Sequence, residues 1–174
     1  MSELNTDEMP SPIGEIVIAW RGDALHSLYF CDHRDRMLAW FHSRFPEVEL
    51  RPRKSSEFRR RLERYFAGDF TAFDGARLEP GGTAFQKKVW DALLEIPPGK
   101  TASYGEIAAR IGAPSAARAV GMANGLNPIS IAIPCHRVVG SNGKLTGYGG
   151  GMDRKQWLLA HEAGVRSRQA ALKF

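Results

Sequence analysis

One short segment of the chain combines a thiol and an imidazole within an otherwise apolar run. It has the sequence IPCHRVVG and places Cys135 directly before His136. A cysteine with its usual pKa near 8.5 is mostly protonated at neutral pH, so it needs a base to become a nucleophile. Side chains of neighbours in an extended strand point to opposite faces, so we expect a bridging water between thiol and ring. No carboxylate lies within ten residues of Cys135, which makes Glu162 of the last predicted helix a candidate partner.

The same residues admit two other interpretations. A cysteine beside a histidine in an apolar strand is also typical of a buried structural thiol. Metal ligation requires a spacing that Cys135 and His136 lack, and His26, Cys31 and His33 form at most a loose cluster without a fourth ligand. We therefore predict no metal site.

Length, cysteine content and charge limit the class of protein. The 174 residues suit one average domain or two small ones, and two cysteines favour free thiols over a disulfide framework. The first residues lack the pattern of a secretory signal, and no window has the roughly 18 apolar residues of a membrane span. We expect a cytoplasmic protein. Residues 1–82 carry a net charge of −2 and residues 83–174 carry +7, an asymmetry typical of a nucleic-acid partner or of a solvated surface.

The first half of the chain has the patterns of a small sheet with helices. IGEIVIAW and ALHSLYF predict a hairpin, and DRMLAWFHSRF predicts an amphipathic helix with Phe41 on its apolar face. SSEFRRRLERYFAG predicts a second helix, capped by Ser55 or Ser56, whose arginine run is expected on the solvated face. Residues 79–82 predict the end of a linker, because Pro and Gly replace periodicity there.

The second half predicts short helices and a glycine-rich loop. Thr83 can cap a first helix, and Ser103 with Glu106 three residues later has the spacing of a capping box. We expect another helix to begin with Pro114, which gives a helix-turn-helix whose Ala- and Gly-rich second helix suits close approach to DNA or plain packing. Residues 140–151 are too rich in glycine for regular structure. A last helix, MDRKQWLLAHEAG, precedes a polar tail that we expect to fray.

Several of these segments resemble the O6-alkylguanine-DNA alkyltransferases. The resemblance rests on NPISIAIPCHRVVGSNGKLTGYGGG, SAARAVGMANG and RKQWLLAHEAG, continuous from about residue 82 to 164, and more loosely on SPIGEI and LERYFAG. It implies an α+β fold in two domains. Residues 1–80 would form a supporting domain with a ribonuclease-H-like antiparallel sheet and helices. Residues 81–174 would form a mainly helical DNA-binding domain that carries the alkyl acceptor.

The resemblance also implies catalytic roles. Cys135 would accept the alkyl group from O6 of guanine as a thioether, so that each molecule acts once. His136, through a water, and Glu162 would form the relay that generates the thiolate. Asn127 would order the segment between the second helix of the helix-turn-helix and the active-site strand.

Contacts with DNA follow from the same resemblance. The nucleotide must be flipped out of the duplex for a buried thiol to reach it. Arg118 would fill the vacated space and Tyr104 would press on the 3′ phosphate. The second helix would enter the minor groove, and the other expected contact residues of the helix pair are Ser103, Ala117, Ala119 and Gly121. The base pocket would be formed by Tyr148, Val138 and Gly149. The small residues of its loop predict acceptance of alkyl groups larger than methyl.

The expected partner is therefore double-stranded DNA that contains O6-alkylguanine, with O4-alkylthymine left open. We expect no cofactor, no metal, no membrane association and a monomer, with cooperative binding to DNA left open. His26 resembles one zinc ligand of some family members, but the matching cysteines are absent. Two alternatives remain: a protein that binds damage or regulates without transfer, and a hydrolase with a Cys–His pair. Cys135 argues against the first, because relatives that only flag lesions carry tryptophan there.

Overall fold

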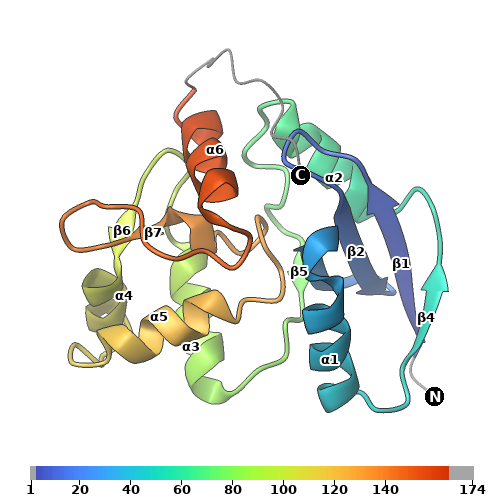
Figure 1. Ribbon diagram of the computed structural model, residues 1–174, viewed down its shortest axis with the longest axis horizontal. Coiled ribbons are helices and arrows are strands. Elements are labelled where there is room, and N and C mark those ends of the chain that lie inside the picture. Colours follow the sequence, from blue (N-terminus) through green and yellow to red (C-terminus); the bar gives the residue numbers. More distant parts are fainter. Residues whose placement is uncertain (1–2, 165–174) are drawn as a thin grey trace. The chain divides into compact units, whose positions relative to one another are not determined.

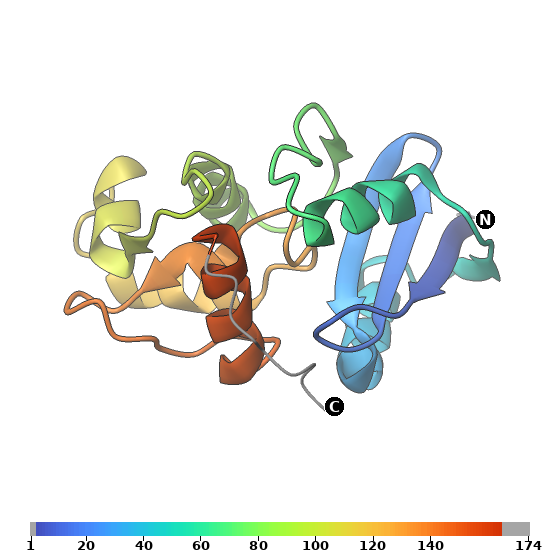
Figure 2. The same ribbon diagram turned by 90° about the horizontal axis from the view of Figure 1, so that it is seen from above.

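The computed structural model describes residues 3–164 of the chain. The chain divides into two compact units that meet in sequence at Pro80 and Gly81. Figures 1 and 2 show the elements of both units. Over residues 3–164, no helix combines the length and the apolar character needed to cross a membrane. The predicted polar tail lies outside the described residues.

The first unit is built on a mixed sheet with the strand order β4-β1-β2-β3-β5 (Figure 1). The strands are β1 (Glu3–Met9), β2 (Ile16–Arg21), β3 (Ala24–Phe30), β4 (Glu49–Pro52) and β5 (Arg77–Leu78). The predicted hairpin is confirmed, because β2 and β3 pair antiparallel around Gly22, whose φ is 59°. The expectation of a wholly antiparallel sheet is wrong: β4 runs parallel to β1, and β5 runs parallel to β3. Each of these edge strands follows a helix, and a helical crossover returns the chain in its original direction.

Strand β2 is buried on both of its faces. Val17 and Ala19 belong to a buried cluster with Phe41 of helix α1 (Arg34–Arg44), which follows the short 3-10 helix η1 (Cys31–His33). Ile16 and Ile18 are equally buried and point to the opposite face, because successive side chains of a strand alternate. Helix α1 therefore covers one face of the sheet, as its spacing of apolar residues predicts.

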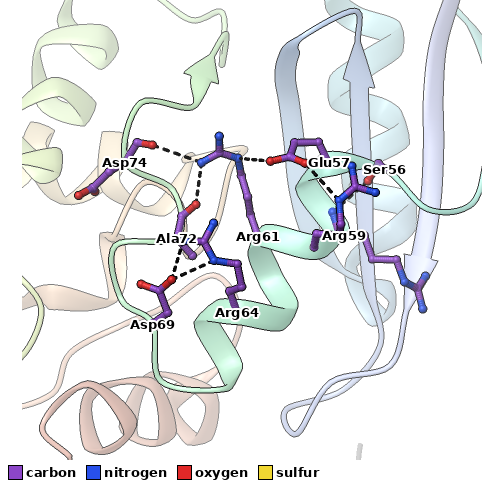
Figure 3. A network of polar contacts seen from close by, with 9 residues as sticks. Ser56, Glu57, Arg59, Arg61, Arg64, Asp69, Ala72 and Asp74 are labelled. Carbon is purple, nitrogen blue, oxygen red and sulfur yellow. Dashed lines mark hydrogen bonds and ion pairs between the residues drawn. The ribbon is translucent and has the colours of Figure 1, made fainter.

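Arginines of helix α2 (Glu57–Phe66) form hydrogen bonds and an ion pair with the loop that follows the helix (Figure 3). The hydroxyl of Ser56 accepts from the backbone N–H of Arg59 at 3.0 Å and caps the helix. Arg61 donates to the carbonyl oxygen of Ala72 at 2.7 Å, and Arg64 pairs with Asp69 at 2.6 Å. The expectation of a purely solvated arginine face is therefore wrong for Arg61, because two loop carbonyls, those of residues 72 and 74, need a donor.

The second unit contains the remaining helices and a two-stranded parallel sheet. Its elements are α3 (Ala84–Leu94), β6 (Ala102–Ser103), α4 (Tyr104–Arg110), α5 (Ala117–Gly125), η2 (Cys135–Arg137), β7 (Val138–Val139) and α6 (Met152–Glu162). Strand β6 pairs with β7. The predicted capping box at Ser103 with Glu106 is confirmed, and the predicted cap at Thr83 forms a capping box as well, with Gln86. Helices α3, α4 and α5 pack against one another, so that α4 and α5 form the predicted helix-turn-helix (Figure 1).

Helix α5 begins three residues later than predicted. Pro114 lies in a turn closed by the bond from the N–H of Ala116 to the carbonyl of Ala113, 2.9 Å long. Ala116 is the N-cap and Ala117 the first helical residue. Proline suits the second position of such a turn as well as the first position of a helix, because its fixed φ fits both.

Candidate active site

Cys135 is buried at the start of the 3-10 helix η2 and not in a strand as expected. The amide of Asn127 holds the preceding segment, because its nitrogen donates to the carbonyl of Ile133 at 2.8 Å and its oxygen accepts from the N–H of Ile129 at 3.0 Å. The side chain of Asn124 donates to the carbonyl of Cys135 at 3.3 Å. These side-chain bonds and the local backbone bonds of the run, such as that from the N–H of Cys135 to the carbonyl of Ile133, hold the segment in turns and not in a strand.

Glu162 of α6 meets two residues of η2. Its Oε1 lies 2.8 Å from Nε2 of His136, so the predicted pairing of these residues is present. Arg137 donates from Nε to Oε2 and from Nη2 to Oε1, each at 2.8 Å, and from Nη1 to the carbonyl of Ile96. All three ionisable side chains are buried. Arg137 is not among the catalytic residues expected from the sequence. Its place in the Pro-Cys-His-Arg run is the signal that could have identified it as one of them.

The electrostatics of this cluster set the protonation states. Burial acts to raise the pKa of Glu162, but hydrogen bonds from His136 and Arg137 hold that pKa well below its usual range. Burial lowers the pKa of His136, against the opposing effect of Glu162. The ring is therefore neutral near pH 7. Because the carboxylate is ionised and can only accept, Nε2 of His136 carries the proton and donates it, and Nδ1 is the basic nitrogen.

The thiol itself is not ionised in this state. Burial raises the pKa of Cys135 to about 11, although a hydrogen bond with Asn127 and the charge of Lys155 act to lower it. Nδ1 of His136 is buried and has no hydrogen-bond partner within residues 3–164. The ring therefore does not hydrogen-bond the thiol directly, which disfavours the hydrolase alternative. The arrangement suits removal of the proton by His136 through an intervening water.

Lys155 is a second functional candidate that the expectation from sequence missed. It is fully buried on α6 and donates from Nζ to the carbonyls of Val138, at 2.5 Å, and of Thr146, at 2.7 Å. Burial lowers its pKa, while the nearby Cys135 acts to raise it. It lies three and seven residues before the buried Leu158 and Glu162, a helical spacing that could have placed it on the inward face.

The expected pocket residues differ in burial and in their relation to this cysteine. Val138 of β7 is buried, and Gly149 is exposed in the predicted irregular loop. Tyr148 lies close enough to Cys135 for the two to interact electrostatically, and burial raises its pKa well above the usual value. The hydroxyl of Thr146 in the same loop donates to the hydroxyl of Tyr104 at 3.1 Å, which connects the loop to the start of α4.

The expected DNA-contacting residues lie on the helix-turn-helix. Ser103 caps α4, and Tyr104 is its first residue. On α5, Arg118 and Ala119 are exposed, whereas Ala117 is partly buried. The remaining residue of this group is Gly121, where an added Cβ would lie 3.6 Å from the ring of Tyr104. Some small residues of α5 therefore pack against the rest of the unit, and others lie at its surface.

The candidate metal ligands do not come together. Nε2 of His26 lies 3.5 Å from Glu79, and Nε2 of His33 lies 3.9 Å from Asp32. Over the described part of the chain, the three residues close enough to share an ion are Glu8, Glu15 and Cys31. The guanidinium of Arg34 donates to two of them, Glu8 and Cys31, so a positive charge already neutralises this group.

Comparisons with known proteins agree with this architecture. A family model described as "6-O-methylguanine DNA methyltransferase, DNA binding domain" matches residues 84–164, and one described as the "ribonuclease-like domain" of the same family matches residues 8–80. A methylated-DNA--protein-cysteine methyltransferase of Mycolicibacterium paratuberculosis is 51% identical over 154 residues, which cover 87% of this chain and 88% of that protein. Its counterpart in Salmonella typhimurium is 44% identical over 169 residues, covering 93% and 97%.

The solved structures are equally similar. The crystal structure of Mycobacterium tuberculosis OGT in complex with DNA superimposes with a TM-score of 0.81 at 47% identity, covering 92% of this chain and 94% of that one. Fold and sequence together define a DNA-repair methyltransferase with its own DNA-binding domain. The chain belongs to the methylated-DNA--protein-cysteine methyltransferase (O6-methylguanine DNA methyltransferase) family. The expected family, α+β class and methyltransferase activity are therefore confirmed.

Proposed function

We propose that this chain repairs O6-alkylguanine in double-stranded DNA by transferring the alkyl group to the sulfur of its own Cys135. The S–C bond forms as the C–O6 bond breaks, and the guanine leaves with the electron pair of that bond. The observation that carries the proposal is the buried cysteine beside the His136–Glu162–Arg137 cluster in a member of this family. The product is a thioether, which no ordinary reductant cleaves. Each molecule therefore acts once and needs no cofactor.

The proton of the thiol leaves by way of His136. The neutral ring accepts it at Nδ1 through a water while Nε2 keeps its bond to Glu162. The imidazolium that forms lies against the ionised carboxylate, whose orientation Arg137 fixes with two bonds. Transfer of the proton thus converts a neutral pair of groups into a thiolate and a cation that Glu162 stabilises. Asn127 contributes by ordering the backbone before Cys135 and by its hydrogen bond with the thiol.

DNA binding by the helix pair delivers the base. Extrusion of a nucleotide costs a few kcal/mol, and Arg118, exposed on α5, would fill the space that the base leaves. Tyr104 would contact the 3′ phosphate and Ser103 the neighbouring backbone. Ala117, Ala119 and Gly121 would allow the helix to lie deep in the minor groove. Because that groove carries degenerate information, recognition would depend on the flipped base and not on the surrounding sequence.

The extruded base would lie between β7 and the glycine-rich loop. Tyr148 would contact its ring, and backbone groups near Val138 and Gly149 would bind its edge. The glycines around Gly149, which is itself exposed, would leave room for alkyl groups larger than methyl. O4-alkylthymine is a second candidate substrate of the same pocket.

The two units would divide these tasks. Residues 81–174 would hold both the DNA-binding surface and the acceptor, and residues 1–80 would support them. We propose that the protein acts as a monomer in the cytoplasm, with no membrane partner. Cooperative assembly along DNA would be a property of the bound state.

The decisive experiment is intact-mass analysis after incubation with duplex DNA carrying one O6-methylguanine, followed by peptide mapping. We expect one added methyl group per molecule, on the peptide that contains Cys135, without turnover. Cys135→Ser should bind the same DNA in a salt-sensitive way and transfer nothing. Methylation of Cys31 would place the acceptor elsewhere. Unchanged mass with tight binding would favour a damage-flagging protein, and regenerated thiol would favour a hydrolase.

A further inference from the structure

Helix α5 exposes more apolar surface than its role in packing requires. Single exposed hydrophobic side chains are common on folded domains, whereas exposed ones that adjoin one another mark surfaces that bind something. Over residues 3–164 the exposed large hydrophobic residues are Leu94, Met122, Leu126, Leu145 and Met152. Met122 lies on α5 and is 67% exposed, and Leu126, the C-cap of α5, is 42% exposed.

These two side chains continue the row that begins with Arg118. Residues 118, 122 and 126 are spaced by four, so they lie above one another on one face of the helix. The opposite face is committed to the core, where Val120 is buried and the indole of Trp90 donates to the carbonyl of Ala123 at 2.9 Å. The face that carries the exposed arginine therefore also carries an apolar strip.

We propose that Met122, supported by Leu126, is a DNA-contacting residue that packs against the sugars and base edges of the minor groove next to the flipped nucleotide. The inference rests on the proposed function, because it takes α5 as the helix that enters DNA. One turn of helix separates Met122 from Arg118, about 6 Å along the axis. That distance corresponds to roughly two base steps of 3.4 Å, so Met122 contacts the duplex beside the vacated space.

The chemistry of the residue fits this occupant. Proteins that bind the minor groove use apolar wedges, methionine among them, against base steps that they distort. The unbranched thioether adapts to an irregular surface without a fixed partner. Arg118 lies one turn away in the same row, and residues 83–174, which include α5, carry a net charge of +7, which favours a polyanion such as DNA over an apolar protein partner.

The test compares truncations on two exposed positions of the same unit. Met122→Ala and Leu94→Ala, each in the full-length chain with Cys135→Ser, are titrated with duplex DNA carrying one O6-methylguanine at several salt concentrations. We expect Met122→Ala to weaken binding about tenfold, since it removes most of the apolar surface that the groove would cover. Leu94, 47% exposed on α3, lies outside the row, so Leu94→Ala should bind like its parent. Met122→Leu should restore most of the affinity.

The salt dependence separates this contact from an ionic one. Loss of one phosphate contact lowers the slope of log K against log salt by about one, whereas Met122→Ala, which removes no charge, should keep the slope of the parent. Unfolding midpoints of all variants control for stability, and alanine is a good helix former. An unchanged DNA affinity of Met122→Ala, or an equal loss of affinity in Leu94→Ala, would overturn this inference and leave the proposed function intact. A wild-type chain that transfers no methyl group from the duplex would overturn the proposed function as well.

Discussion

The carboxylate of Glu162 is the most informative group to perturb, because two side chains of η2 converge on it. Arg137 donates to both oxygens of this carboxylate and His136 donates to one of them, and each of these hydrogen bonds is 2.8 Å long. Glu162→Gln removes the negative charge and leaves the buried guanidinium without a counter-charge. Removal of one partner of a buried ion pair costs about 3–5 kcal/mol. We expect a loss of that size in the free energy of unfolding, measured by urea denaturation.

The same substitution should also slow the reaction at Cys135. A glutamine neither stabilises the imidazolium nor enforces the tautomer of His136. General-base assistance contributes about 10²–10⁴-fold. We therefore expect the single-turnover rate with duplex DNA carrying O6-methylguanine to fall about a hundredfold at pH 7 without denaturant. Asp153→Asn is the matched control, since it removes a carboxylate from an exposed position of α6. It should change stability by less than about 0.5 kcal/mol.

A double variant distinguishes the role in stability from the role in transfer. Replacing a buried ion pair by apolar residues of similar size is often neutral, so Glu162→Leu with Arg137→Met should recover most of the stability lost by either single change. The transfer rate should stay low, because His136 still lacks its carboxylate. A loss of less than about 1 kcal/mol in Glu162→Gln, or a double variant with the wild-type rate, would refute this account of the cluster.

Three further predictions test other parts of the molecule. Arg118→Ala should slow repair of duplex DNA far more than reaction with free O6-benzylguanine, because only the duplex has a void to fill; equal losses in the two single-turnover assays would assign the residue to the fold. Gly82→Ala should cost about 2 kcal/mol or more in urea unfolding, because φ is +91° and the new Cβ would lie 2.6 Å from the ring of Trp90; Gly143→Ala, at φ +76° with open space around it, should cost less. Burial lowers the pKa of His136 from its usual 6.5, so the unfolded chain binds the proton first as the pH falls. The free energy of unfolding should therefore decrease below pH 6.5. A His136→Asn variant should show a shallower decrease, and an equal slope would contradict the lowered pKa of His136.

Elements set by residues close in sequence could be predicted well. The hairpin around Gly22 and the caps at Thr83 and Ser103 occur as expected, because each depends on side chains only a few positions apart. The start of α5 was misplaced because Pro114 satisfies a turn and a helix start equally. The parallel edge strands could not be predicted, since the partner of β4 is β1, more than 40 residues away, and short exposed strands carry little pattern.

The sequence by itself determined which reactive groups the protein has and which family it resembles. Cys135, His136 and Glu162 could be named as candidates because their types and order are visible in the chain. Only the tertiary structure decided how they meet. Twenty-six residues separate His136 from Glu162, and the glycine-rich connection between them has no periodicity that would fix its path. The tertiary fold also buried Arg137 and Lys155 beside them, and burial in a medium of low dielectric is what shifts the pKa values on which the chemistry depends.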